Sequence, residues 1–482
     1  MNKPNILLIT TDQQRFDTIQ ALGNGHIYTP NLNWLVDQGI TFTRCYSDSP
    51  VCMPARATIM TGRHGYNHGL VANQGHVAPL AQNPTLPGVL TSMGYQTRAQ
   101  GKMHFHPMRA NYGFEHVELP MDYYRERNRN ERDGVPKAHG VAENQIQPVI
   151  STVHETDSLT HWTAKRSIDF LETRDPTRPF FLWTSFTKPH PPYDPALNYW
   201  LLYQNKEVPP PVYGEWSRDM ATMPQGLLEG TYSCTDMHRM SERQLLEMKR
   251  AYYACITQVD YTLGLIFARM RELNLLENTW IIFTADHGDM QGDHHIAAKG
   301  TFHEGSAHIP LIVRPPLGGW GRGEHTAKKC WSLVTLADIM PTALAIAEGN
   351  PFGAETKPGM DGKNLLTLIN NDTEDRTFYG QCLRHFCVMD GDNKYMWTAK
   401  GGTEQMFNLM HDPEEQHDLS KSPSWQEELL PLREKLIAFC KAHAPDCIED
   451  GKLKILPAIT GPDDIEKWPG YHSTVADSDV LH

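Results

Sequence analysis

Three short, continuous apolar runs constrain the fold of this chain more than any other feature. They cover residues 5–10, 179–186 and 280–285, and polar residues bound each of them. Such runs favour strands that are buried on both faces. Helical patterns lie between them, over residues 160–173 and from about 241 to 273. Strands that alternate with helices predict an α/β fold, in which helices cover both faces of a large, mostly parallel sheet.

The pattern of the sequence changes after residue 351. Short strand-like pieces at 377–381, 386–389, 394–398 and 405–408 precede a helical pattern from about 424 to 443. They indicate a smaller antiparallel sheet with one packed helix. We therefore expect a large α/β domain over residues 1–350, a smaller α+β subdomain over 351–450, and a tail, 451–482, that lies on the surface or joins subunits of a homo-oligomer.

Charge and cysteine content narrow the classes of partner. Asp and Glu number 57 against 44 Lys and Arg, which gives a formal net charge of −13, and no basic block occurs. This argues against a nucleic-acid surface. The nine cysteines form no C-x-x-C pair, which fits a reducing compartment better than a disulfide framework.

The start of the chain bears on its location. No charged leader or long apolar segment precedes residue 5. We therefore expect a cytoplasmic protein that does not bind membranes, although a periplasmic protein with its signal peptide removed would look the same.

A polar cluster follows each of the three apolar runs. In α/β sheets, ligands bind at the carboxyl ends of strands, so these clusters mark the expected site. Carboxylates such as Asp12 and Asp286, from separate strands, can converge there on a hard divalent cation. An isolated Thr-Asp-Gln can equally form a strand-end turn or a helix cap. The clusters are Thr11-Asp12-Gln13, Lys188-Pro189-His190-Pro191 and Asp286-His287-Gly288-Asp289.

The stretch from Cys52 to Arg63 carries the most chemical information. It reads Cys-Met-Pro-Ala-Arg and continues Ala-Thr-Ile-Met-Thr-Gly-Arg. It resembles the maturation signature of the type I sulfatases of the alkaline phosphatase superfamily, whose cysteine is oxidised to formylglycine. The resemblance extends from residue 5 to 409, and it implies that a formylglycine-generating enzyme converts Cys52 to an aldehyde. The alternative is a structural cysteine in a turn stiffened by Pro54.

An aldehyde offers chemistry that a thiol lacks, because its hydrate carries two hydroxyls on one carbon. One hydroxyl attacks the sulfur of a sulfate ester and forms a covalent intermediate. The second, once deprotonated, re-forms the carbonyl and expels sulfate. No water then has to attack the hindered, negatively charged sulfur.

The resemblance also implies a metal site. The commonest family pattern has a second Asp at position 13 and an Asn at position 287, where this chain has Gln13 and His287. Fewer carboxylates neutralise a divalent ion less, and Gln and His are weaker-field or softer donors. The expected ion is Ca²⁺, with Mg²⁺ or Mn²⁺ as alternatives. The implied ligands are Asp12, Gln13, Asp286, His287 and the modified Cys52.

Gly101-Lys102-Met103-His104 resembles the Gly-Lys-x-His element of the family. The resemblance implies that Lys102 binds a sulfate oxygen and the hydrated aldehyde. It also implies that His104 takes the proton from the second hydroxyl, and a histidine suits this role because its ordinary pKa is near 6.5. His106 is the competing assignment.

Two further segments resemble family elements. The first, residues 188–193, matches Pro-His-x-Pro and implies that His190 protonates the leaving alcohol. Lys188 beside it either contacts sulfate or lies on the loop surface. The second, residues 292–300, matches Gly-x-His followed by Gly-Lys-Gly. It implies that Lys299 is a second lysine on the sulfate and that His294 binds substrate, while His295 faces substrate or solvent.

Arg56 lies one turn into the helix expected to begin at Cys52. The resemblance implies that it holds the hydrate and its sulfated form. The helix N-terminus directs unpaired N–H groups and positive dipole at the developing charge. Together with Lys102 and Lys299, Arg56 makes the expected site net positive inside an acidic protein.

These features support three functional hypotheses. The first is a hydrolase of sulfate monoesters, acting on a small anionic ester or a sulfated saccharide. The second is a phosphonate monoester or phosphodiester hydrolase on the same scaffold, because Gln13 with His287 resembles that branch and the choline sulfatases. The third is an inactive metal-binding relative. Arg384 and the arginines of residues 125–132 either bind a substrate carboxylate, such as a uronic acid, or are solvated.

Overall fold

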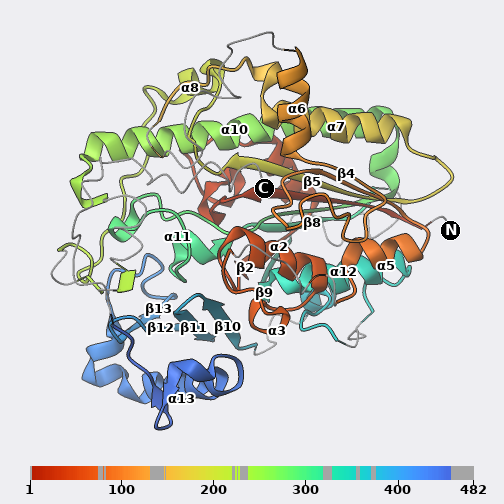
Figure 1. Cartoon of the computed structure of the whole chain (residues 1–482). Coiled ribbons are helices and arrows are strands. Elements are labelled where there is room, and N and C mark those ends of the chain that lie inside the picture. The colour runs from red at the N-terminus through yellow and green to blue at the C-terminus, as the bar shows by residue number, and fades with distance from the viewer. Residues whose placement is uncertain are drawn as a thin grey trace.

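The computed structural model describes residues 3–73, 80, 83–130, 146, 148–219, 223–224, 226–227, 237–317, 328–353, 359–370 and 376–457. Its main unit is a nine-stranded sheet in the order β4-β3-β5-β1-β6-β8-β2-β7, with β9 paired to β2. Figure 1 shows this sheet between two layers of helices. The strands are β1 (Asn5–Asp12), β2 (Ile40–Tyr46), β3 (Gln96–Gly101), β4 (His116–Glu118), β5 (Phe180–Pro189), β6 (Thr279–Ala285), β7 (His308–Ile309), β8 (Leu311–Arg314) and β9 (Lys328–Thr335).

The predicted α/β fold with a mostly parallel sheet is confirmed. β1 lies between β5 and β6 and runs parallel to both, and β3 is parallel to β5 and β4. β8 is antiparallel to β6 and β2, and β7 is antiparallel to β2, so the sheet is mixed on that side. The three predicted strands are β1, β5 and β6, and each is slightly longer or shifted by a residue.

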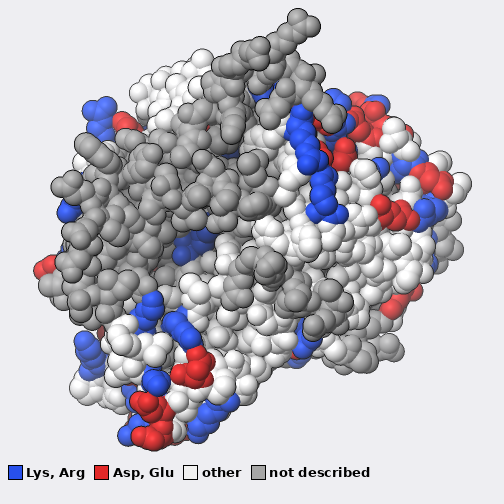
Figure 2. Space-filling model, in the orientation of Figure 1, with Lys and Arg blue, Asp and Glu red and all other residues white. Residues whose placement is uncertain are grey.

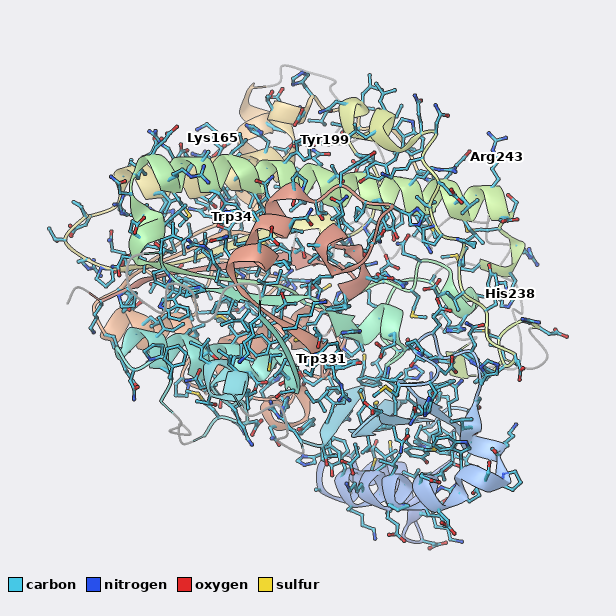
Figure 3. The ribbon with its side chains drawn as sticks, turned by 180° about the vertical axis from the view of Figure 1, so that it is seen from behind. Trp34, Lys165, Tyr199, His238, Arg243 and Trp331 are labelled. Atoms are coloured by element: carbon cyan, nitrogen blue, oxygen red, sulfur yellow. The ribbon has the colours of Figure 1, made fainter. Side chains whose placement is uncertain are left out.

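Both faces of β1 are buried, which explains its continuous apolar sequence. Ile6 and Leu8 join the core under α2, α5 and α12, whereas Leu7 and Ile9 join the core under α1, α7 and α10. From behind, Figure 3 shows Trp34 of α1 beneath α10. The helices of this unit are α1 (Pro30–Gln38), α2 (Cys52–Thr61), α3 (Gly65–His68), α5 (Leu86–Ser92), α6 (Pro120–Asn130), α7 (Leu159–Thr173), α8 (Leu197–Tyr203), α10 (Glu242–Glu272), α11 (Glu304–Ala307) and α12 (Ile339–Ala347).

The predicted smaller antiparallel sheet with one helix is confirmed. One face of the sheet packs on α13, and the other packs against Trp216, Met290 and Phe302 of the main unit. Figure 1 shows this sheet and helix below the main sheet. The elements are β10 (Phe378–Cys382), β11 (His385–Asp390), β12 (Asn393–Thr398), β13 (Thr403–Asn408) and α13 (Gln426–His443), followed by a two-stranded ribbon, β14 (Ile448–Glu449) and β15 (Lys452–Leu453).

Several expectations fall partly or wholly outside the described residues. They are most of the tail 451–482, residues 131–145 of the polar insertion with Arg132, and Cys234. The proposed domain boundaries at 350 and 450 stay predictions. Within the described ranges, each helix is too short or too polar to cross a membrane.

A buried lysine joins the small sheet to the main unit. The ammonium of Lys394, on β12, donates to the carbonyl of Phe302 at 2.9 Å and to Glu415 Oε1 at 2.9 Å, and it also pairs with Glu304. Its side chain has no exposed surface. Removing this cation would leave two carboxylates unbalanced away from water.

We therefore expect Lys394→Met to lower the free energy of unfolding by about 3–5 kcal/mol. The control is Lys435→Ala, which removes a partly exposed ion pair between α13 and Asp390 and should cost less than about 1 kcal/mol. Urea unfolding followed by tryptophan fluorescence measures both. If both variants lost the same free energy of unfolding, the buried contact of Lys394 would contribute no more to stability than the exposed ion pair.

Candidate active site

The carboxyl ends of four neighbouring strands meet at one edge of the sheet. Asp12 ends β1 and is in register with Pro189 at the end of β5. Asp286 follows β6, and Lys102 follows β3. His190 follows β5. The strand-end side chains that the sequence singled out therefore lie side by side, as expected for an α/β sheet.

Four of these side chains form a compact group of metal-binding atoms. One donor atom from each of Asp12, Cys52, Asp286 and His287 lies within 4.8 Å of the others, and all four residues are buried. Cys52 Sγ lies 3.3 Å from His287 Nε2 and 3.8 Å from Asp12 Oδ1. His287 Nε2 lies 3.7 Å from Asp286 Oδ1. Donors bound to one cation at 2.0–2.6 Å have such separations.

The charges of this group also fit a divalent cation. Burial and the adjacent Asp12 carboxylate raise the pKa of Asp286. Burial also opposes ionisation of Asp12, but Lys102, His190, Arg56 and His287 together outweigh it and hold the pKa of Asp12 well below its usual range. Two buried carboxylates this close repel each other, and a cation between them removes that repulsion. The residues present therefore fit a hard metal ion.

Arg56 binds the outer oxygens of the two carboxylates. Its guanidinium donates to Asp286 Oδ2 at 3.0 Å and to Asp12 Oδ2 at 3.1 Å. It also donates to the carbonyl of Lys102 at 2.6 Å and to Ser185 Oγ at 2.7 Å. The side chain is fully buried. In this structure the donors of Arg56 therefore hold the two carboxylates, and its expected contact with the hydrate stays a prediction.

Cys52 is the first residue of α2, and all ten residues of this helix are buried. The helix dipole therefore points its positive end at the group. Lys102 Nζ lies 4.0 Å from Cys52 Sγ and 2.7 Å from Asp12 Oδ2. Burial opposes ionisation, yet the cations Lys102 and Lys299 lower the pKa of the Cys52 thiol well below its ordinary value.

Gln13 lies beside the group and is fixed at every polar atom. Its N–H donates to Asp286 Oδ1 at 3.1 Å, and its carbonyl accepts from the hydroxyl of Tyr252 at 2.7 Å. Its Oε1 accepts from Lys299 Nζ at 2.5 Å, and its Nε2 donates to Asp289 Oδ2 at 2.7 Å. Gln13 has a φ of 72°, a left-handed conformation that non-glycine residues rarely adopt. The surroundings hold this strained residue in place.

The two histidines expected to move protons differ in their contacts. Burial lowers the pKa of His190, and Lys299 and Lys102 lower it further. Its Nδ1 bonds to the carbonyl of Pro191 at 2.8 Å. His104 also has a left-handed φ, of 60°, and within the described chain its buried Nδ1 has no hydrogen-bond partner. The lowered pKa favours the neutral ring of His190, and His104 keeps one ring nitrogen without a partner among the described residues. Both features suit proton transfer.

Two basic residues that the sequence offered as candidates for substrate binding make contacts elsewhere. Lys188 pairs with Asp194 and lines a pocket formed by Tyr123, Pro192 and neighbouring residues. Arg384 lies in the small sheet, where it pairs with Asp446. The structure does not place these two basic groups on the metal-binding atoms.

His294 has a structural environment. Its Nδ1 accepts from the N–H of Gly214 at 3.2 Å, its Nε2 bonds to the carbonyl of Glu414 at 3.1 Å, and its ring stacks on Trp216. Both ring nitrogens are therefore in use inside the protein. Its neighbour His295 stacks on Tyr213 and His238.

The sequence analysis missed three residues that support the site: Ser185, Tyr193 and Asp289. Ser185 Oγ donates to the carbonyl of Lys102 at 2.5 Å and accepts from Arg56. Tyr193 donates to the carboxylate of Asp289. Asp289 belongs to the polar cluster after β6, so its place near the strand end was a usable signal.

Figure 2 shows a hollow on one face of the molecule with lysine or arginine atoms at its floor, in the region of α11 in Figure 1. Lys299 belongs to the segment that leads into α11. Locally concentrated positive charge in an acidic chain agrees with a site for an anion.

The contacts of His294 predict a dependence of stability on pH. Burial lowers its pKa to about 4, against about 6.5 in the unfolded chain. The neutral ring therefore stabilises the fold above pH 6.5, and this contribution is lost as the pH falls toward 4. When the pH falls from 7.5 to 5, the free energy of unfolding of His294→Gln should decrease by about 2 kcal/mol less than that of the wild type. Urea unfolding measures the difference, and equal slopes would contradict it. A KM that rose tenfold would instead support substrate binding by His294.

Comparisons with known proteins agree with this geometry. The sequence model described as "Sulfatase" matches residues 4–349. The chain is 33% identical over 486 residues to an arylsulfatase of Clostridium perfringens, covering 94% of this chain and 97% of that protein.

The chain is also 29% identical to a choline-sulfatase of Rhizobium meliloti, over 87% of this chain and 83% of the relative. The crystal structure of a phosphonate monoester hydrolase of Agrobacterium radiobacter has the same fold, with a TM-score of 0.74, 22% identity, and 92% and 96% of the two chains covered. The chain belongs to the sulfatase family.

Proposed function

We propose that this protein hydrolyses sulfate monoesters, with a formylglycine formed from Cys52 as nucleophile and a divalent cation, Ca²⁺ in the first place, as cofactor. The observation that carries the proposal is the position of Cys52. It lies at the buried N-terminus of α2, among Asp12, Asp286 and His287 and 4.0 Å from Lys102. A formylglycine-generating enzyme is the maturation partner that this chemistry requires.

Asp12, Gln13, Asp286, His287 and residue 52 would hold the cation. When bound, the cation stabilises negative charge on the oxygens of the ester and of the hydrated aldehyde. Arg56 orients the two carboxylates toward it, because the guanidinium occupies their outer oxygens.

Lys102 and Lys299 bind the sulfate group. Lys102 Nζ lies 4.0 Å from Cys52 Sγ and Lys299 Nζ lies 2.5 Å from Gln13 Oε1, so both ammonium groups border the candidate site. Fixed charges in a site that excludes water favour the transition state, and one such contact is commonly worth ~3 kcal/mol. The N-terminus of α2 adds to the same positive field.

The two histidines carry protons. His104 accepts a proton from the hydrate through its unpartnered ring nitrogen. His190 donates a proton to the leaving alcohol. The two lysines lower its pKa in the free site, and the negative charge of a bound sulfate ester offsets them. Substrate binding therefore raises the pKa of His190 and makes it a better acid.

The chemical class of the alcohol is proposed as aryl or carbohydrate. Its support is the likeness to an arylsulfatase over nearly the whole chain. A phosphonate monoester or phosphodiester is the second candidate, favoured by the pair Gln13 and His287 in the metal-binding group. A cytoplasmic location and a homo-oligomer formed through the tail stay predictions from the sequence.

The protein made in a host that forms formylglycine should hydrolyse sulfate esters, and Cys52→Ala should lower turnover by at least about a thousandfold because it removes the nucleophile. The variant should keep the Tm of the wild type. A panel of 4-nitrophenyl sulfate, sulfated sugars and matched phosphonate monoesters measures kcat/KM. Peptide mass spectrometry shows whether Cys52 has lost its thiol. A phosphonate preference of orders of magnitude would establish the second candidate, and full activity of Cys52→Ala would refute the mechanism.

His190→Ala should affect esters according to their leaving group. For alkyl or sugar sulfates we expect kcat to fall by about 10²–10⁴-fold, because an alkoxide leaves poorly without a proton. For 4-nitrophenyl sulfate the loss should stay below about tenfold, since nitrophenolate needs no acid. Steady-state kinetics on both substrates measures the ratio. Equal losses on the two esters would exclude leaving-group protonation by His190.

A further inference from the structure

Asp289 is a buried carboxylate one contact removed from the metal-binding atoms. It is 1% exposed and follows Asp286 by three residues. Its Oδ2 accepts from Gln13 Nε2 at 2.7 Å, from Gln291 Nε2 at 2.8 Å and from the hydroxyl of Tyr193. Its Oδ1 accepts from the N–H of Gln291 at 3.1 Å. In the described part of the chain no ion pair joins this carboxylate to a lysine, arginine or histidine, so its partners are all neutral donors.

The neighbours of Gln13 determine which end of its amide faces the site. An amide has a donor end and an acceptor end of nearly the same shape. Lys299 can only donate a hydrogen bond, and Asp289 Oδ2 accepts hydrogen bonds from Gln13, Gln291 and Tyr193. The carbonyl oxygen of Gln13 must therefore face Lys299, and its NH₂ group must face Asp289. The two main-chain hydrogen bonds of Gln13 hold its left-handed backbone in place.

We propose that Asp289 is a positioning residue that aims the carbonyl oxygen of Gln13 at the cation. This inference rests on the proposed metal-dependent function. An aspartate at position 13 would need no such partner, because a carboxylate presents an oxygen in either orientation. A glutamine presents an N–H dipole to the cation when its amide is reversed. The Gln13 variant of this site therefore requires an acceptor behind the amide, and Asp289 supplies it.

The cost of losing this partner can be estimated. Outer partners of metal ligands typically contribute 10–100-fold to metal affinity. Asp289→Ala leaves Gln13 Nε2 without its acceptor, so we expect the affinity for Ca²⁺ to fall by about 10–100-fold. Asp289→Asn keeps an oxygen that can accept from Gln13 Nε2, and it should stay within about threefold of wild type, because the amide remains aimed.

Isothermal titration calorimetry on protein stripped with a chelator measures the affinity, with CaCl₂ as the probe and MgCl₂ and MnCl₂ in parallel. The matched control is Asp293→Asn, a buried carboxylate of the same segment that pairs with Arg15 and does not touch Gln13. This variant should lower the Tm but leave the affinity for Ca²⁺ within about twofold of wild type, because the orientation of the metal ligands does not change. Wild-type affinity in Asp289→Ala would overturn the proposal. An equal loss of affinity in Asp289→Asn and Asp289→Ala would also overturn it. The cause would then be the negative charge of Asp289 and not the orientation of the Gln13 amide.

A double-mutant cycle tests whether Asp289 acts through Gln13. In a Gln13→Ala background, Asp289→Ala should change the affinity by less than about twofold, and an undiminished second loss would overturn the proposal. If Asp289→Ala does not fold, Gln13→Glu replaces it. A glutamate at position 13 repels Asp289, so Gln13→Glu should raise the affinity more in the Asp289→Asn background than in wild type. Absence of this difference would also overturn the proposal. Because no ester is present, the result is independent of whether the chain turns over sulfates.

Discussion

The buried ion pairs of Arg56 are the contact on which the rest of the site depends. The guanidinium joins Asp12 at the end of β1 to Asp286 after β6, and its own helix, α2, begins with Cys52. It therefore sets the position of Cys52 relative to two central strands. Arg56 and both carboxylates are fully buried, so removing any one of them would leave an unbalanced charge, at a cost of about 3–5 kcal/mol. Such buried ion pairs add little to stability compared with an apolar core. They do, however, restrict Arg56, Asp12 and Asp286 to nearly one arrangement.

The central strands could be predicted from the sequence and several outer ones could not, for a physical reason. β1, β5 and β6 are covered on both faces, and each contains a run of four consecutive apolar residues. β2 (Ile40–Tyr46) begins with alternating apolar and polar residues, and β3 (Gln96–Gly101) is almost entirely polar. A surface loop can have either pattern. β9 begins with two lysines and exposes Trp331 (Figure 3). These strands are defined by pairing with segments far along the chain, and that pairing leaves no local pattern.

The candidate site divides in the same way. Asp12, Asp286 and Lys102 could be found because they end strands, and the order of strands then brings them together. The direction of a loop side chain could not be found. Lys188 also lies at a strand end, but its ammonium forms an ion pair with Asp194, a few residues farther along the chain. His294 matches a family motif by type, yet its ring faces Trp216 and Glu414. A motif specifies a residue and its spacing, whereas packing decides which way that residue points.

The small C-terminal sheet supports the loop that leads into Cys52, although the two lie more than 300 residues apart in sequence. The N–H of Gln381, in β10, donates to the carbonyl of Asp48 at 2.9 Å, and the hydroxyl of Ser49 donates back to the carbonyl of Gln381. Both contacts hold the loop that leads into Cys52. A Cβ added at Gly300, beside Lys299, would lie 3.9 Å from Cys382 Sγ. β10 thus contacts the segments that contain Cys52 and Lys299, and the buried Lys394 joins its sheet to the main unit. The residues of the candidate site belong to the first 300 residues of the chain. The small C-terminal sheet contacts the segments that carry two of them, Cys52 and Lys299.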